Sequence, residues 1–140
     1  MISNKEEETY KIAKKYCEDL NGGEVILLKG DLGSGKTTFV KGVAEFFNIK
    51  KEEIISPTFT IFNNYKVENN KKIKNIIHID AYRIENEEEF LETGALEYFY
   101  NENTVVFIEW PENIKSFLGN TQRIIEFKAI YDDKREIIIT

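Results

Sequence analysis

The order of hydrophobic and polar residues predicts a helix, a strand and a second helix in the first third of the chain. Apolar residues recur at helical spacing before residue 21, and this stripe consists of Ile12, Ala13, Tyr16, Cys17 and Leu20. Ser3 and Glu6 have the spacing of a capping box at the start of this helix. Residues 25–28 form a short apolar run typical of a strand that is covered on both faces, and residues 36–47 return to helical spacing. The pattern therefore predicts a buried strand that a loop joins to a helix.

Strand patterns outnumber helix patterns in the rest of the chain. The stretches FTIFNNYKV and KIKNIIHID indicate two antiparallel strands around a lysine-rich turn, and TVVFIEW indicates another buried strand. The stretch ENEEEFLETGALEYFY is helical but broken near Gly94, and RIIEFKAI and REIIIT close the chain as a hairpin. We predict an α/β fold, with one mixed central β-sheet flanked by helices, and a single domain over residues 1–140.

Composition and charge limit the classes of partner and location. The net charge is −6, so the overall field repels a polyanion and a broad nucleic-acid-binding surface is not expected. The local exception is the turn with Lys66, Lys71, Lys72 and Lys74, which is either a solvated turn or a contact with RNA. No apolar run approaches the ~20 residues that span a bilayer, and the N-terminus is charged. A single cysteine forms no internal disulfide, so we expect a cytoplasmic protein without a membrane segment.

The loop between the buried strand and the second helix has the sequence GDLGSGKTTF. It satisfies the pattern G-x-x-x-x-G-K-S/T at the strand-to-helix junction that this pattern requires. Glycines let successive amide N–H groups point at phosphate, the lysine contacts β- and γ-phosphate oxygens, and the hydroxyl after it ligates Mg²⁺. We predict a P-loop NTPase domain. Its predicted nucleotide-binding residues are Asp31, Gly33, Ser34, Gly35, Lys36, Thr37 and Thr38.

Two carboxylates end apolar strands and are predicted to complete a Mg²⁺ site. Asp80 closes IIHID and Glu109 closes VVFIE, so each is placed at the carboxyl end of a strand, where α/β sheets bind ligands. Because Mg²⁺ prefers oxygen ligands, we assign Glu109 and Thr37 to the metal. Asp80 is assigned to the metal or to orienting the attacking water, and the two acids could exchange roles. The predicted catalytic residues are Lys36, Asp80 and Glu109.

Three further features lie near these motifs. His78 faces the same side of a strand as Asp80, and a hydrogen bond that orients a neighbour is favoured over a catalytic role. Trp110, beside the second carboxylate, either packs near the nucleotide or fills the core. The stretch SPTF presents the hydroxyls of Ser56 and Thr58 on a bend, as in a loop that senses γ-phosphate or in a plain loop.

Five motifs in this order resemble the TsaE family, also called YjeE, the ATPase of bacterial tRNA threonylcarbamoyladenosine synthesis. They are GDLGSGKTTFVKG, SPTFTI, HIDAYRI, EEEFLETGALEYF and VVFIEWPE, and together they extend over nearly the whole chain. The first motif is shared by many NTPases, whereas the series is specific. The resemblance implies a small P-loop domain that binds Mg²⁺ with ATP or ADP and hydrolyses ATP slowly. It also implies the TsaB and TsaD proteins as partners, through which tRNA would be met indirectly.

The resemblance supports the residues assigned from the motifs and adds others. It implies that Asp80 is needed for hydrolysis, and it makes Ser56 and Thr58 a nucleotide-sensing switch loop. An N-terminal acidic segment and a late arginine approach the nucleotide in this family, which points to Glu6 and Arg135 as further nucleotide-binding residues. The oligomeric state stays open, with a monomer as one option.

Two other functional classes remain open at this level. A small-molecule P-loop kinase shares the loop and the carboxylates but also carries arginines in a lid. The arginines of this chain, Arg83, Arg123 and Arg135, lie in no lid-like insertion. A nucleotide-gated binding module that does not hydrolyse ATP is harder to separate, because a switch and a slow ATPase use the same site.

Overall fold

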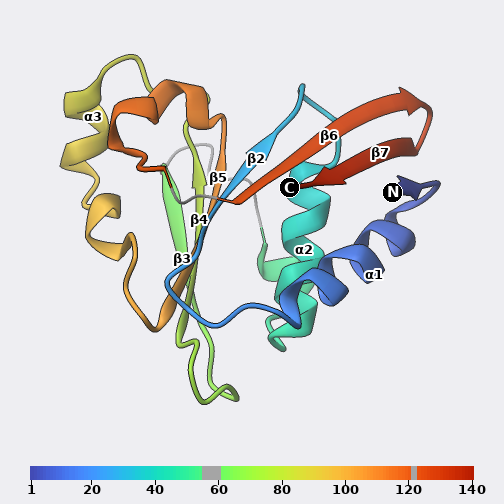
Figure 1. Cartoon of the computed structure of the whole chain (residues 1–140), viewed down its shortest axis with the longest axis horizontal. Helices are drawn as coiled ribbons and strands as arrows, with labels where there is room; N and C mark the ends of the chain where they lie inside the picture. Colours follow the sequence, from blue (N-terminus) through green and yellow to red (C-terminus); the bar gives the residue numbers. More distant parts are fainter. Residues whose placement is uncertain (55–60, 121–122) are drawn as a thin grey trace.

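The structure is a computed structural model that describes residues 1–54, 61–120 and 123–140. The strands are β1 (Ile2–Ser3), β2 (Val25–Lys29), β3 (Phe62–Lys66), β4 (Asn75–Asp80), β5 (Thr104–Glu109), β6 (Arg123–Tyr131) and β7 (Lys134–Ile139). The α-helices are α1 (Glu6–Cys17), α2 (Lys36–Phe46) and α3 (Glu87–Glu92), and the short 3-10 helices are η1 (Lys51–Glu53), η2 (Ala95–Tyr98) and η3 (Pro111–Phe117). Figure 1 shows a central sheet with α1 and α2 on one side and α3 on the other.

The sheet is mixed, as the sequence predicted. Its strand order is β1-β7-β6-β2-β5-β4-β3. Strands β6, β2, β5 and β4 are parallel, whereas β3 pairs antiparallel with β4, and β7 pairs antiparallel with β6 and β1. Both predicted hairpins, β3–β4 and β6–β7, are therefore confirmed. The parallel centre of the sheet places the carboxyl ends of β2, β4 and β5 at one edge.

The core is divided by the sheet into two apolar clusters. On the side of α1 and α2, Phe39 and Val43 of α2 belong to the same cluster as Phe107 of β5. On the other side, Phe90 of α3 belongs to a cluster with Ile108 of β5. Because β5 contributes to both clusters, all six of its residues are buried, which explains the unbroken apolar run at residues 105–108.

Helices α1 and α2 pack closely at a glycine. A Cβ atom at Gly42 would lie 2.7 Å from the Cβ of Ala13 and 2.9 Å from the Cα of Tyr10. Real Cβ atoms essentially never approach another heavy atom this closely, so either a helix shifts or the contact is strained. The glycine thus sets how α2, the helix that follows the P-loop, sits against α1.

We expect Gly42→Ala to lower the free energy of unfolding by up to about 2 kcal/mol, because overpacking of about 1–3 kcal/mol outweighs the roughly 1 kcal/mol by which alanine favours a helix. Urea unfolding measures this change. The same substitution in an Ala13→Gly background should cost less, since one of the two close contacts is gone. A gain in stability for the single variant would contradict the packing described.

The beginning of α1 differs from the predicted capping box. Helix α1 starts at Glu6 with Lys5 at its N-cap position, and no side chain caps it. Ser3 instead lies in β1, where it pairs with Arg135 of β7. Its hydroxyl donates to the carbonyl of Lys5 at 2.9 Å and lies 2.7 Å from the hydroxyl of Thr9. Because Ser3 pairs with β7, it does not take the N-cap position of α1. The contacts of its hydroxyl with Lys5 and Thr9 connect the start of α1 to the edge of the sheet.

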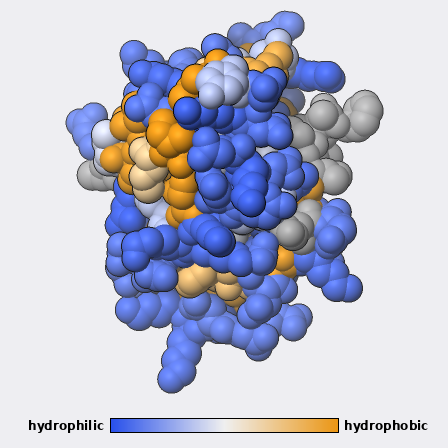
Figure 2. Space-filling model, turned by 90° about the vertical axis from the view of Figure 1, so that its right-hand side faces the viewer, coloured by the Kyte–Doolittle hydropathy of each residue, from blue (hydrophilic) through white to orange (hydrophobic). Residues whose placement is uncertain are grey.

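The described residues include no helix that is long and apolar enough to cross a membrane. Figure 2 shows that the side of the molecule with the N-terminus and α1 is mostly hydrophilic, with a strip of hydrophobic residues. Large exposed hydrophobic side chains at the N-terminus and on the β6–β7 hairpin are Met1, Ile2, Ile130 and Tyr131. The hydrophilic surface is in keeping with a chain in which 31% of the residues are charged.

Candidate nucleotide-binding site

The parallel strands bring the P-loop and both predicted acids to one edge of the sheet. In the register of the central strands, Glu109 pairs with Leu28 of β2 on one side and with Asp80 of β4 on the other. The loop 30–35 follows β2 directly and leads into α2. The arrangement is the one that the strand-end positions of the two acids predicted, and it is typical of α/β ligand sites.

The last loop residue, Gly35, is in a conformation that excludes a side chain. It caps α2 with φ 110° and ψ 12°, in the left-handed region. A Cβ atom there would lie only 2.1 Å from Nη1 of Arg135, so the guanidinium of β7 lies directly against the loop. Glycine is therefore needed for the backbone angle and for the approach of Arg135. The arginine adds a positive charge to the helix N-terminus that would face phosphate.

Lys36 is buried at the entrance of α2, with 4% of its surface exposed. Its ammonium donates a hydrogen bond to the carbonyl of Gly30, lies 3.5 Å from the carbonyl of Asp31 and sits 4.1 Å from the centre of the Trp110 ring. Burial lowers the pKa of Lys36, and the nearby carboxylates, led by Glu109, oppose this shift. The lysine is thus held at the start of α2 by two carbonyl groups and an aromatic face.

The sequence left open whether Trp110 lies at the nucleotide site or in the core, and its ring contacts both regions. Its ring lines the cavity over the P-loop beside Lys36, and it also packs at the edge of the core cluster on the α3 side. The ring of Tyr82 lies beside it, with ring centres 5.0 Å apart. The tryptophan therefore forms a wall of the cavity rather than being enclosed in the core.

Thr37, Glu109 and His78 form a chain of polar contacts from α2 across β5 to β4. The hydroxyl of Thr37 donates to Oε2 of Glu109 at 3.3 Å, and Nε2 of His78 lies 2.5 Å from the same oxygen. His78 is fully buried and Glu109 is only 4% exposed. The expectation that His78 orients a neighbour by a hydrogen bond agrees with this geometry.

The residues around Thr37 fit a Mg²⁺ ion of the kind that accompanies a nucleotide. Such an ion takes one or two protein oxygens, and phosphate oxygens and water complete its six ligands. The hydroxyl of Thr37 and the carboxylate of Glu109 are the required donor types, and Asp80 lines the same cavity. The described residues contain no group of three or more His, Cys, Asp or Glu side chains that could hold a metal. A Mg²⁺ ion at this position would therefore need the nucleotide for its remaining ligands.

A cavity of about 300 Å³ lies above these groups. It is lined by Glu6, Leu32, Gly33, Gly35, Lys36, Thr37, Thr38, Asp80, Glu109, Trp110 and Arg135. The structure thus brings together most of the predicted site residues, including the two that rested on the resemblance alone. Of the predicted loop residues, Asp31 is exposed and Ser34 is buried, and neither contributes to the described lining. Ser56 and Thr58 lie outside the described residues.

Leu32 is the lining residue that the sequence did not single out. It is 69% exposed at the tip of the P-loop. Helical or strand periodicity identifies apolar residues that face a core, and a lone leucine in a glycine-rich loop has no such pattern. Only its position inside the motif could have indicated that it borders the cavity.

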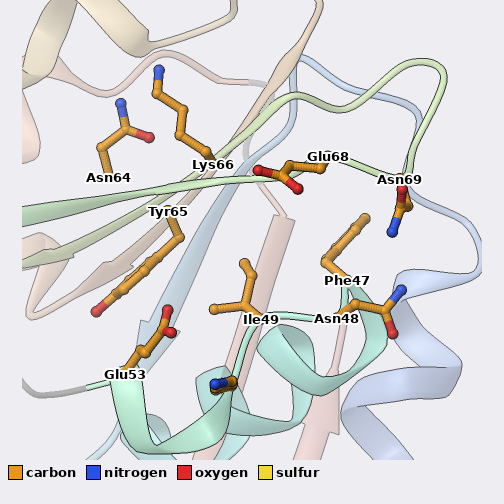
Figure 3. A pocket seen from close by; sticks show the side chains of 10 residues that line it. Phe47, Asn48, Ile49, Glu53, Asn64, Tyr65, Lys66, Glu68 and Asn69 are labelled. Carbon is orange, nitrogen blue, oxygen red and sulfur yellow. The ribbon is translucent and has the colours of Figure 1, made fainter.

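A second cavity, of about 370 Å³, lies near the other end of α2 (Figure 3). Phe47, Asn48 and Ile49 of the segment after α2 face Tyr65 and other residues of β3 and its following loop across it. A helix of this length separates its ends by roughly 16 Å, so this cavity is distinct from the one at the P-loop. Two lysines and two glutamates line it, Lys50, Lys66, Glu53 and Glu68, so its charges balance and favour no anion.

Comparison with known proteins places the chain in a family. The family model described as "Threonylcarbamoyl adenosine biosynthesis protein TsaE" matches residues 3–137. The chain belongs to the TsaE family. TsaE proteins function in threonylcarbamoyladenosine biosynthesis, as the family description states. The resemblance inferred from the five motifs is therefore confirmed.

Individual relatives agree with this assignment. The chain is 42% identical to the tRNA threonylcarbamoyladenosine biosynthesis protein TsaE of Bacillus subtilis (strain 168), over 96% of this chain and 80% of the relative. It is 37% identical to the TsaE protein of Aquifex aeolicus (strain VF5), over 99% of this chain and 93% of the relative. The crystal structure of YdiB from Bacillus subtilis superimposes with a TM-score of 0.74 at 33% identity, covering 99% of this chain and 82% of that one. The α/β fold is thus shared with a solved structure.

Proposed function

We propose that this TsaE protein is a slow, Mg²⁺-dependent ATPase that acts with TsaB and TsaD in the threonylcarbamoyl modification of tRNA. The observation that carries the proposal is the 3.3 Å contact between Oγ1 of Thr37 and Oε2 of Glu109 at the N-terminus of α2. A P-loop alone is consistent with any use of a nucleotide. A P-loop whose hydroxyl meets a strand-end carboxylate has the two protein oxygens that a Mg²⁺–ATP complex requires.

Each residue of the cavity has a distinct part in this proposal. The backbone amides of residues 33–37 and the ammonium of Lys36 bind the phosphates, and Arg135 adds positive charge beside them. Mg²⁺ held between Thr37 and Glu109 would neutralise charge that develops on the β- and γ-phosphate oxygens. Asp80 is held by the backbone N–H of Tyr82, 3.0 Å from its Oδ1, and is proposed to orient the attacking water. Glu6 borders the cavity from the start of α1 and completes its rim.

TsaB and TsaD enter the proposal through the family, and the charge of the chain supports an indirect contact with tRNA. The relatives from Bacillus subtilis and Aquifex aeolicus carry the tRNA modification in their names. A net charge of −6 is unfavourable for a protein that grips RNA by itself. We therefore propose that partner proteins hold the tRNA while this chain binds and hydrolyses ATP.

Phosphate release from ATP and Mg²⁺ tests the proposal, measured with the protein alone and with TsaB and TsaD, and with Lys36→Ala as the control. We expect slow release by the protein alone, a changed rate in the presence of both partners, and no release above background by the variant. Because the same protein, partners and buffer are used for the control, contaminating ATPases contribute equally to both measurements.

Two other results would point elsewhere. ATP binding without Lys36-dependent phosphate release, in both conditions, would identify a nucleotide-gated binding module. Transfer of the γ-phosphate to a small acceptor instead of water would identify a kinase. Either result would overturn the proposed ATPase.

A further inference from the structure

His78 occupies a position that packing alone would give to an apolar residue. It is fully buried in β4, between Ile77 and Ile79, which are also fully buried. A buried imidazole costs free energy unless its nitrogens have partners. Its Nδ1 atom has no hydrogen-bond partner among the described residues. The contact of the other nitrogen with Glu109 is therefore the feature that distinguishes this histidine from its apolar neighbours.

The direction of that contact follows from the chemistry of the two groups. A carboxylate that holds Mg²⁺, as proposed for Glu109, only accepts hydrogen bonds, so Nε2 of His78 would donate to its Oε2, across 2.5 Å. The same oxygen accepts the hydroxyl of Thr37 at 3.3 Å. One carboxylate oxygen is thus fixed between a donor inside the sheet and a donor of the P-loop helix.

We propose that His78 is a positioning residue that holds the carboxylate of Glu109 in the orientation required for the Mg²⁺ site. This inference rests on the proposed function, in which Glu109 and Thr37 hold the ion. Groups that hydrogen-bond to a metal ligand fix its orientation, and their loss usually lowers metal affinity or activity by about 10- to 100-fold. Here a histidine supports a carboxylate ligand. Without the imidazole N–H, the carboxylate would lose a donor and rotate more freely about its last bond.

Variants at His78 separate the hydrogen bond from the packing. His78→Gln keeps an N–H group near the place of Nε2, whereas His78→Phe keeps a ring without a donor. His78→Asn has an amide that is too short to reach Glu109 and serves as a second variant without the hydrogen bond. Ile77→Val, on the opposite face of the same strand, is the control for a small loss of core packing. Thermal unfolding of each variant establishes that it is folded.

The main measurement uses a fluorescent ATP analogue, whose affinity is determined at increasing Mg²⁺ concentrations. The Mg²⁺ concentration that gives half of the increase in affinity is the Mg²⁺ midpoint. We expect His78→Phe and His78→Asn to raise this concentration about 10- to 100-fold. Their affinity for the analogue without Mg²⁺ should stay within about 2-fold of the wild type, because the hydrogen bond of His78 is to Glu109 and not to the P-loop. His78→Gln and Ile77→Val should stay within a few-fold of the wild type in both measurements. In His78→Phe and His78→Asn, the fold decrease in kcat for ATP should be larger than the fold increase in KM.

The measurement distinguishes failure of this inference from failure of the proposed ATPase. An unchanged Mg²⁺ midpoint in a folded donor-free variant would overturn the role of His78, as would an equal loss in His78→Gln. If Mg²⁺ does not increase the affinity of the wild type, Glu109 is no metal ligand here and the inference fails with it. If the wild type binds Mg²⁺ and nucleotide but releases no phosphate, only the proposed hydrolysis fails, since the Mg²⁺ midpoint still tests His78.

Discussion

Replacing Glu109 by glutamine is expected to lower the kcat for ATP by about 100-fold or more while leaving Mg²⁺-independent nucleotide binding nearly unchanged. The side chain keeps its size, and at the end of β5 it contacts the hydroxyl of Thr37 rather than supplying one of the backbone amides proposed to bind phosphate. The substitution removes the negative charge that the proposed ion requires beside Thr37. Single-turnover phosphate release measures the chemical step, and titration with an ATP analogue without Mg²⁺ measures binding.

Glu112→Gln is the matched control for charge. Glu112 follows Glu109 closely in the chain, is exposed and does not line the cavity at the P-loop, so its loss changes the net charge equally without altering the proposed metal ligands. A similar fall in kcat for both variants would mean that general electrostatics, rather than ligation at Glu109, explains the effect.

Asp80→Asn resolves the division of roles that the sequence left open. If Glu109 holds the metal and Asp80 orients water, both substitutions lower kcat, but only Glu109→Gln raises the Mg²⁺ concentration needed for tight nucleotide binding. The opposite pattern would exchange the two assignments. Both acids line one cavity and pair in neighbouring strands, so the comparison changes one charge at a time in the same environment.

The parts of the fold that the sequence predicted are those with local signals. The middle of β5, residues 105–108, is buried on both faces and therefore forms an uninterrupted apolar run. The P-loop motif describes one loop between adjacent elements, and the β6–β7 hairpin joins strands that are close in the chain. By contrast, β1 has two residues and pairs with β7, more than 130 residues later, so no periodicity could indicate it. That same distant pairing removed Ser3 from the predicted capping box.

The candidate site was predictable to the extent that its residues belong to motifs or end strands. Lys36 and Thr37 follow from the loop pattern, and Asp80 and Glu109 follow from strand ends. The contact of His78 with Glu109 depends on the register between β4 and β5, across 31 positions of the chain, which no local pattern fixes. The guanidinium of Arg135 reaches Gly35 because β7 returns beside the P-loop. A family resemblance could therefore indicate Arg135, whereas the spacing of motifs along the chain could not.

Lys36→Met is expected to weaken ATP binding roughly 10- to 100-fold, which corresponds to the loss of one hydrogen bond from a charged group at about 1.5–3 kcal/mol. Its effect on the nucleotide-free protein should be small. Burial lowers the pKa of Lys36, which means that the folded chain holds the charged form at a cost in free energy. Methionine fills a similar volume without that cost, so the free energy of unfolding should stay within about 1 kcal/mol of the wild type. Binding titration and urea unfolding measure the two quantities.

The pH dependence of stability gives this prediction a second test. Because the pKa of Lys36 is lower in the folded chain than in the unfolded chain, the unfolded chain binds more protons as the pH approaches the ordinary lysine pKa of about 10.4. The wild type should therefore gain stability relative to Lys36→Met as the pH rises toward that value. Lys41→Met, in the same helix but outside the cavity lining, is the control. It should change neither ATP binding nor the pH dependence of the free energy of unfolding. A large fall in the free energy of unfolding of Lys36→Met at neutral pH would show that Lys36 stabilises the fold. A role in phosphate binding alone would then not explain why this lysine is buried.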